Sequence, residues 1–171
     1  KQWEFEAEGA IAATPLVYND TVYIGSFDRH FYAVDAADGR LRWEVMGENW
    51  FWAKPIAYDN DIYAPCLNGY VYALDAGSGD KLAEFDLGSP VSASPVVVDS
   101  AIIFASQKGV IYALDTGSNQ LRQLADIEEE VYGPLSSSGG VVYIHTQDLT
   151  IHAVDASRGA KLKTISLKRG E

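Results

Sequence analysis

Short apolar runs alternate with turn-forming residues along the whole chain. In the first quarter the predicted strands are Ala12 to Tyr18, Thr21 to Ser26, His30 to Asp35 and Arg40 to Met46. Runs of this length that are rich in Val, Ile and Tyr, and that end in Asn, Asp or Gly, predict antiparallel strands joined by tight turns. The two middle runs are apolar at successive positions, so we expect a sheet that is covered on both faces.

The same pattern returns every 40 residues. An aspartate that ends an apolar run marks each repeat: Asp35, Asp75, Asp115 and Asp155. A glycine follows in three of the four repeats: Gly39, Gly79 and Gly159. Asn119 takes the remaining place, and asparagine is the usual substitute where the backbone needs a positive φ. Four strands in each repeat of this length predict the blades of a β-propeller, which is an all-β fold.

The motif Ala33-x-Asp35-x-x-x-Gly39-x-x-x-Trp43 resembles the tryptophan-docking motif of pyrroloquinoline-quinone (PQQ) repeats. This family contains propellers like the quinoprotein alcohol dehydrogenases and BamB, and the resemblance covers nearly the whole chain. The aspartate is expected to accept N–H groups of the following turn, and the glycine to let that turn reverse. The tryptophan is expected to bury its ring against the neighbouring blade. In the later repeats its place is taken by other residues: Ala83, Gln123 and Lys163.

The repeat sets the expected blade boundaries within one propeller segment that covers residues 1–171. The four predicted blades are 9–46, 47–87, 88–127 and 128–167, with a tail at 168–171. Trp3 lies 40 residues before Trp43, so residues 1–8 are interpreted as the outer strand of a preceding blade. We therefore expect a segment of a seven- or eight-bladed ring, which is the usual size in the family. A dimer of two segments that completes one ring, and a closed four-bladed ring, are the alternatives.

The composition narrows the classes of partner. The formal net charge is −11, and an acidic surface repels phosphate groups, so we expect no nucleic-acid partner. No apolar stretch is long enough to span a membrane. One aspartate in each blade of a radial array leaves the carboxylates far apart, so no metal site is predicted.

The segment Trp50-Phe51-Trp52 departs most from the repeat consensus. Neighbouring residues of an extended chain alternate sides, so three aromatic residues in succession cannot all point into one blade. Two interpretations stay open: a contact surface for a partner or ligand, and packing between blades that replaces the docking ring missing at Ala83. Lys54 follows near the expected central channel, where it could meet an anion, and Tyr132 holds the corresponding position in the fourth blade.

No residues with a catalytic, cofactor-binding or metal-binding pattern are identified. The resemblance implies a disulfide between adjacent cysteines above the cofactor of a quinoprotein dehydrogenase, but Cys66 is the single cysteine. We therefore expect a non-enzymatic module that binds a protein or an extended ligand on a propeller face. An extracytoplasmic location follows from the family resemblance. The alternatives are part of a PQQ-dependent dehydrogenase with bound calcium, and the ligand-sensing ectodomain of a receptor or kinase.

Overall fold

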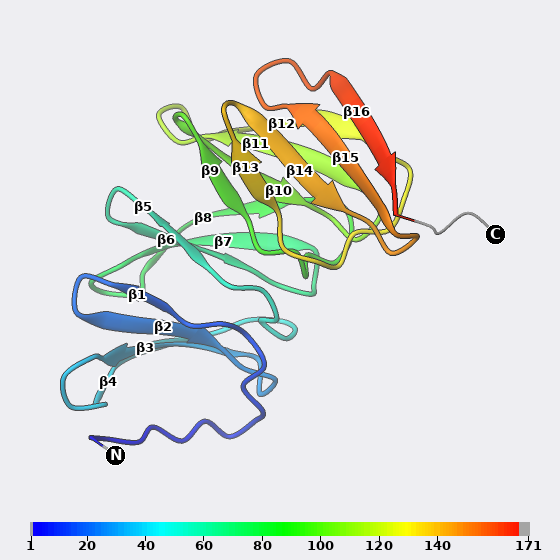
Figure 1. The fold of residues 1–171 in the computed structure, drawn as a ribbon. Coiled ribbons are helices and arrows are strands. Elements are labelled where there is room, and N and C mark those ends of the chain that lie inside the picture. Colours follow the sequence, from blue (N-terminus) through cyan, green and yellow to red (C-terminus); the bar gives the residue numbers. More distant parts are fainter. Residues whose placement is uncertain (1, 168–171) are drawn as a thin grey trace. The chain divides into compact units, whose positions relative to one another are not determined.

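Four antiparallel sheets of four strands each form the computed structural model, which describes residues 2–167 (Figure 1). In each sheet, strands that follow one another in the sequence are hydrogen-bonded neighbours. This arrangement confirms the predicted all-β fold of PQQ-like propeller blades. No helix that could cross a membrane occurs among residues 2–167.

The strands recur at nearly the same places in every repeat. The first blade contains β1 (Leu16–Tyr18), β2 (Thr21–Gly25), β3 (His30–Asp35) and β4 (Leu41–Met46). The second contains β5 (Ile56–Tyr58), β6 (Asp61–Pro65), β7 (Tyr70–Asp75) and β8 (Lys81–Asp86). The third contains β9 (Val96–Val98), β10 (Ala101–Ala105), β11 (Val110–Asp115) and β12 (Gln120–Asp126). The fourth contains β13 (Ser136–Ser138), β14 (Val141–His145), β15 (Thr150–Asp155) and β16 (Lys161–Ser166).

The first strand is shorter than the sequence predicted, because β1 begins at Leu16 and not at Ala12. The residues before Leu16 form a loop that is hydrogen-bonded to the β2–β3 turn. The Phe27 amide in the β2–β3 turn donates to the Ala10 carbonyl at 3.0 Å. Pro15 has no N–H to donate to a neighbouring strand. The predicted tail at 168–171 and residue 1 lie outside the described residues.

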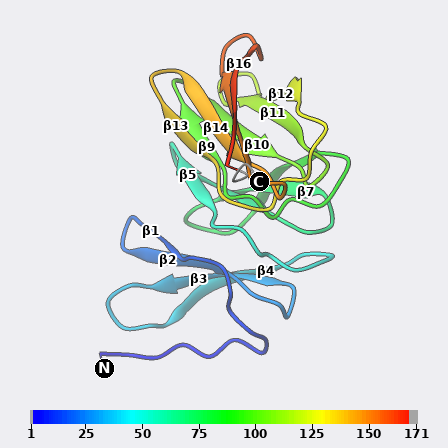
Figure 2. The same cartoon turned by 45° about the vertical axis from the view of Figure 1, so that its right-hand side comes forward.

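The chain divides into two compact units, Lys1–Asp86 and Leu87–Glu171. In the first unit the β1–β4 sheet and the β5–β8 sheet lie face to face (Figures 1 and 2). Their shared core consists of Tyr23, Phe31, Ala33, Trp43, Phe51, Ile62, Ala64, Cys66, Tyr72, Leu74 and Ala76. The core of the second unit draws on both of its sheets in the same way and includes Ile103, Ile111, Ile127, Val131, Val142, Ile144 and Val154. This burial on both faces explains why the middle strands are apolar at successive positions.

The outer strand of each blade contains a β-bulge, but its place differs between blades. In β4 the bulged residue is Arg42, which lies between the paired residues Trp43 and Leu41. In β12 the bulge falls on Leu124 instead. A bulge shifts the register by one residue and so exchanges the inward and outward sides of the strand. Leu124 is consequently buried, whereas Glu44 at the corresponding position of β4 is exposed.

Candidate functional site

The four repeat aspartates, called the turn aspartates from here on, hold the turns that follow β3, β7, β11 and β15. Each accepts a backbone N–H of its own turn at 2.8 to 2.9 Å. Hydrogen bonds hold the pKa of all four carboxyls below the usual range. The largest cause is the Arg42 side chain for Asp35, the Ser78 amide for Asp75, and the hydroxyls of Ser118 and Ser157 for Asp115 and Asp155. No group of three or more His, Cys, Asp or Glu side chains within residues 2–167 is placed to hold a metal ion.

Trp43 of the first blade docks onto the second blade. Its ring lies against Gly79, where a Cβ atom would come within 2.6 Å of the indole. The indole Nε1 donates to the Ala76 carbonyl at 3.0 Å, and the Tyr23 hydroxyl donates to the same carbonyl at 2.9 Å. Gly79 therefore serves two needs: a positive φ of +78° and the absence of a side chain under the ring.

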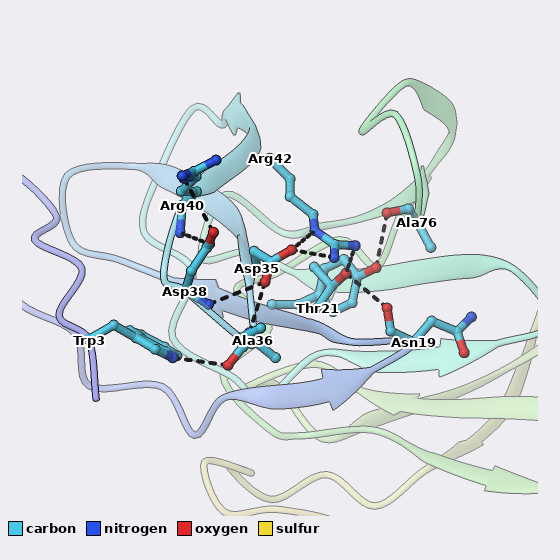
Figure 3. A network of polar contacts seen from close by, with 11 residues as sticks. Trp3, Asn19, Thr21, Asp35, Ala36, Asp38, Arg40, Arg42 and Ala76 are labelled. Atoms are coloured by element: carbon cyan, nitrogen blue, oxygen red, sulfur yellow. Dashed lines mark hydrogen bonds and ion pairs between the residues drawn. The ribbon is translucent and has the colours of Figure 1, made fainter. Parts of the chain in front are cut away.

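Trp3 makes the same contact one repeat earlier. Its Nε1 donates to the Ala36 carbonyl at 2.9 Å (Figure 3), and a Cβ on Gly39 would lie 2.8 Å from its ring. Figure 3 also shows the Arg42 guanidinium beside this turn, at 2.6 Å from the Asp35 carboxylate. The residues around Trp3 are not assigned to a strand, although the ring itself is docked.

Blade docking in the second unit uses residues that the sequence did not reveal. The tryptophan position holds Gln123, which is exposed, while the neighbouring Leu124 turns inward because of the shifted bulge. A Cβ on Gly159 would lie 1.8 Å from the Leu124 carbonyl oxygen, so the two backbones are in direct contact. The Arg122 guanidinium replaces the indole N–H: its Nη2 lies 3.5 Å from the Ala156 carbonyl and 3.1 Å from the Ser157 carbonyl. The replacement of the indole by Arg122 depends on where the bulge falls in β12, and no sequence pattern marked that position.

Phe51 is a core residue, and only 1% of its surface is exposed. Its ring centroid lies 5.4 Å from that of Phe31 and 5.8 Å from that of Tyr72. Two glycines leave room for it: a Cβ on Gly25 would lie 2.3 Å from the Phe51 Cβ, and one on Gly47 would lie 2.7 Å from the ring. Phe51 therefore packs in the core of the first unit, against Phe31 of the first blade and Tyr72 of the second.

Trp50 and Trp52 point the other way and stack on Phe27, which extends from the β2–β3 turn. The Phe27 centroid lies 4.8 Å from that of Trp50, with 14° between the ring planes. It lies 5.1 Å from that of Trp52, with 18° between the planes. Trp50 is 42% exposed and Trp52 44%, so we call these three rings the aromatic surface. Phe27 was not among the predicted residues, because no sequence pattern links it to the distant segment.

The remaining predicted contact residues are Lys54 and Tyr132. Lys54 is exposed and follows the aromatic segment just before β5. Tyr132 belongs to the second unit, is 44% exposed and lines a groove of about 430 Å³ together with Pro90, Gln107, Lys108, Glu129 and Glu130. Tyr132 is the aromatic residue of that groove. The stacked ring pairs described above therefore belong to the first unit.

A comparison with protein families matches residues 1–165 to the family described as outer membrane protein assembly factor BamB. No curated protein sequence matches the chain. Among solved structures, BamB from Moraxella catarrhalis is similar to 96% of this chain at 18% identity, with a TM-score of 0.58. This chain spans 64% of the length of that BamB chain, which is less than two thirds.

Two further solved structures share the fold. The computationally designed Ika4 protein matches 90% of this chain and 96% of its own at 20% identity, with a TM-score of 0.79. The quinohemoprotein alcohol dehydrogenase ADHIIG from Pseudomonas putida HK5 matches 96% of this chain and 35% of its own at 16% identity, also with a TM-score of 0.79. At these identities the likeness concerns the fold alone.

Proposed function

This chain belongs to the family of outer membrane protein assembly factor BamB, and we propose that it is a non-enzymatic propeller module that binds a protein partner in the cell envelope. The family description names an assembly factor, and such a factor acts by contact with other proteins. An extracytoplasmic location is part of the proposal and rests on the same family description. Fractionation of cells that express the tagged full-length gene product tests the location.

The aromatic surface is the observation that carries the binding role. Tryptophan is enriched among the residues that dominate protein–protein binding energies, because a large rigid ring gives contact area at low entropic cost. Trp50 and Trp52 are held in place by Phe27 and yet expose more than two fifths of their surface. Rings that served only the core would be buried, as Phe51 is.

Part of a quinoprotein dehydrogenase is the second candidate, and the fold likeness to ADHIIG favours it. Calcium beside PQQ needs several oxygen ligands. No group of three or more His, Cys, Asp or Glu side chains within residues 2–167 is placed to hold a metal ion. Cys66 is buried with its Sγ 3.3 Å from the Asn49 carbonyl, and burial raises the pKa of this thiol. A buried, protonated thiol supports a structural role for this residue.

The test of the proposal is binding to purified components of the outer-membrane barrel-assembly machine of the source organism. The chain is immobilised and each component is passed over it, with the double variant Trp50→Ser/Trp52→Ser in a parallel channel. The matched control is Leu41→Ser/Leu82→Ser, which removes two equally exposed apolar side chains from outer strands of the same unit. Binding that the tryptophan variant loses and the control keeps supports the role.

A second measurement separates the dehydrogenase candidate. PQQ and calcium are added to the chain, and the absorbance of the cofactor, the thermal midpoint and the reduction of an electron-accepting dye are followed. Dye reduction with an alcohol, or stabilisation by PQQ, would overturn the non-enzymatic role. A chain that binds no component of the assembly machine would overturn the envelope-assembly role.

A further inference from the structure

The aromatic surface consists of three stacked rings, and its two indoles are exposed to more than two fifths. The Phe27 ring is nearly parallel to both indoles and is stacked on each of them. The face of an indole carries the negative lobe of the ring quadrupole, which attracts cations. A planar guanidinium stacks on such a face and keeps its N–H groups free for hydrogen bonds at the rim.

The acidic charge of the protein is concentrated in the unit that carries this surface. Residues 1–86 contain six Lys and Arg against fifteen Asp and Glu, a net charge of −9. Residues 87–171 contain seven against nine, a net charge of −2, and the two values make up the total of −11. Because the field of the first unit is negative, it steers basic segments toward that unit and disfavours acidic ones.

A lysine of the first unit already lies over an aromatic ring of the same unit and beside a carboxylate. The Lys81 Nζ lies 5.9 Å from the centroid of the Tyr72 ring and 2.8 Å from a carboxylate oxygen of Glu84. Tyr72 and Glu84 line a polar pocket of about 100 Å³ together with Glu48. Glu48 is exposed and lies two residues before Trp50 in the same loop, so this loop carries both a pocket carboxylate and one of the stacked rings.

We propose that the aromatic surface, together with Glu48 of the same loop, binds arginine side chains of an extended basic segment in a protein partner. The guanidinium stacks on the exposed indole faces while its N–H groups reach the Glu48 carboxylate. This inference rests on the proposed function, because it specifies the partner chemistry at the same surface. Arg29 and Lys54 lie in the two loops that carry the rings, so the attraction for a basic segment comes from the net charge of the whole unit.

Exposed tryptophans also stack on sugar rings, but the charge favours the peptide. A neutral glycan gains nothing from a net charge of −9, whereas an arginine-rich segment is attracted before contact. An acidic glycan would be repelled. A neutral oligosaccharide therefore enters the experiment as the competing outcome.

The experiment measures fluorescence anisotropy of labelled peptides titrated with the chain. One peptide alternates arginine with serine, a second carries citrulline in place of each arginine, and a third carries glutamate. Citrulline keeps the shape of arginine and removes its charge. The protein variants are Trp50→Ser/Trp52→Ser, Glu48→Gln and the control Leu41→Ser/Leu82→Ser, each first checked for folding by circular dichroism.

We expect the arginine peptide to bind the wild-type chain and to bind the tryptophan variant about tenfold more weakly, since each lost cation–π contact costs a few-fold. Glu48→Gln is expected to weaken binding about threefold in low salt, and the control to leave it unchanged. Equal affinity for the citrulline peptide, unchanged affinity of the tryptophan variant, or preferential binding of a neutral oligosaccharide would overturn the inference.

The two proposals fail separately. A chain that binds a component of the assembly machine but not the arginine peptide retains the proposed function and refutes the inference. A chain that binds the peptide through the two tryptophans but binds no component of the machine refutes the envelope-assembly role and leaves this inference standing.

Discussion

The contact between Gly159 and Leu124 gives the sharpest test of how the blades of the second unit dock. A Cβ on Gly159 would lie 1.8 Å from the Leu124 carbonyl oxygen and 2.8 Å from its carbonyl carbon. These are backbone atoms of an outer strand, so they cannot swing aside as the end of a side chain can. Replacement of Gly159 by alanine must therefore push the fourth blade away from the third.

Gly140 supplies a matched control in the same blade. Its φ is +76°, against +72° for Gly159, and a Cβ there would meet nothing within 4 Å. Both alanine variants pay the cost of a left-handed backbone, about 1 kcal/mol or somewhat more. Gly159→Ala alone adds the cost of overpacking, about 1–3 kcal/mol. We therefore expect a loss of about 1 kcal/mol in unfolding free energy for Gly140→Ala and about 3 kcal/mol for Gly159→Ala.

The assay is urea unfolding of both variants and the wild-type chain, followed by circular dichroism. The two midpoints should separate clearly, with unchanged slopes. Equal losses for the two variants would show that only the backbone conformation matters at these positions. The direct contact between Leu124 and Gly159 would then be refuted as the docking element.

Further predictions concern the cores and the titratable groups. Trp43→Ala should cost about 3–5 kcal/mol in urea unfolding, while Gln123→Ala at the same repeat position should stay within about 0.5 kcal/mol. Phe51→Ala should also cost about 3–5 kcal/mol, whereas Trp50→Ser/Trp52→Ser should cost about 1–2 kcal/mol through lost stacking, and thermal melts can compare the two. The turn aspartates have lowered pKa values in the folded state, so the stability that they contribute is complete above the unfolded pKa of about 4. This stability is lost as the pH falls below that value. Urea midpoints measured at decreasing pH across this range should therefore fall. Burial raises the pKa of Tyr63 to about 12, so the folded state holds the phenol proton more tightly than the unfolded state does. The folded state therefore loses stability as the pH rises above the unfolded pKa of about 10. The absorbance of tyrosinate can follow the ionisation.

The sequence predicted the structure correctly wherever one residue and its immediate neighbours determine the local conformation. The need for a positive φ at one turn position selects glycine or asparagine, and Asn119 is confirmed there with a φ of +55°. The number of strands and the antiparallel pairing also follow from the spacing of turns and apolar runs. The start of β1 was wrong by four residues, because the loop before Leu16 is hydrogen-bonded to the β2–β3 turn through the Ala10 carbonyl, and Pro15 has no N–H for strand pairing.

The candidate site was readable only in part. The segment from Trp50 to Trp52 stood out because its repeat counterparts are small, but the sequence could not divide it into core and surface. That division depends on Gly25 and Gly47, which open the space that Phe51 fills, and on Phe27, which supports the two indoles from another turn. The two contributing segments, 25–27 and 47–52, are separated by the strands β3 and β4, and only folding brings them together.

The sequence alone determined the repeat, the blade type and the turn chemistry of this protein, because each depends on spacings within some forty residues. Tertiary structure decided which residue carries the contact between blades. In β12 the shifted bulge buries the Leu124 side chain. Arg122 then donates to the turn carbonyls of the next blade, as the indole N–H of Trp43 does in the first unit. A register shift of one residue costs little locally yet reverses every side chain beyond it, so its position is set by the packing of whole sheets.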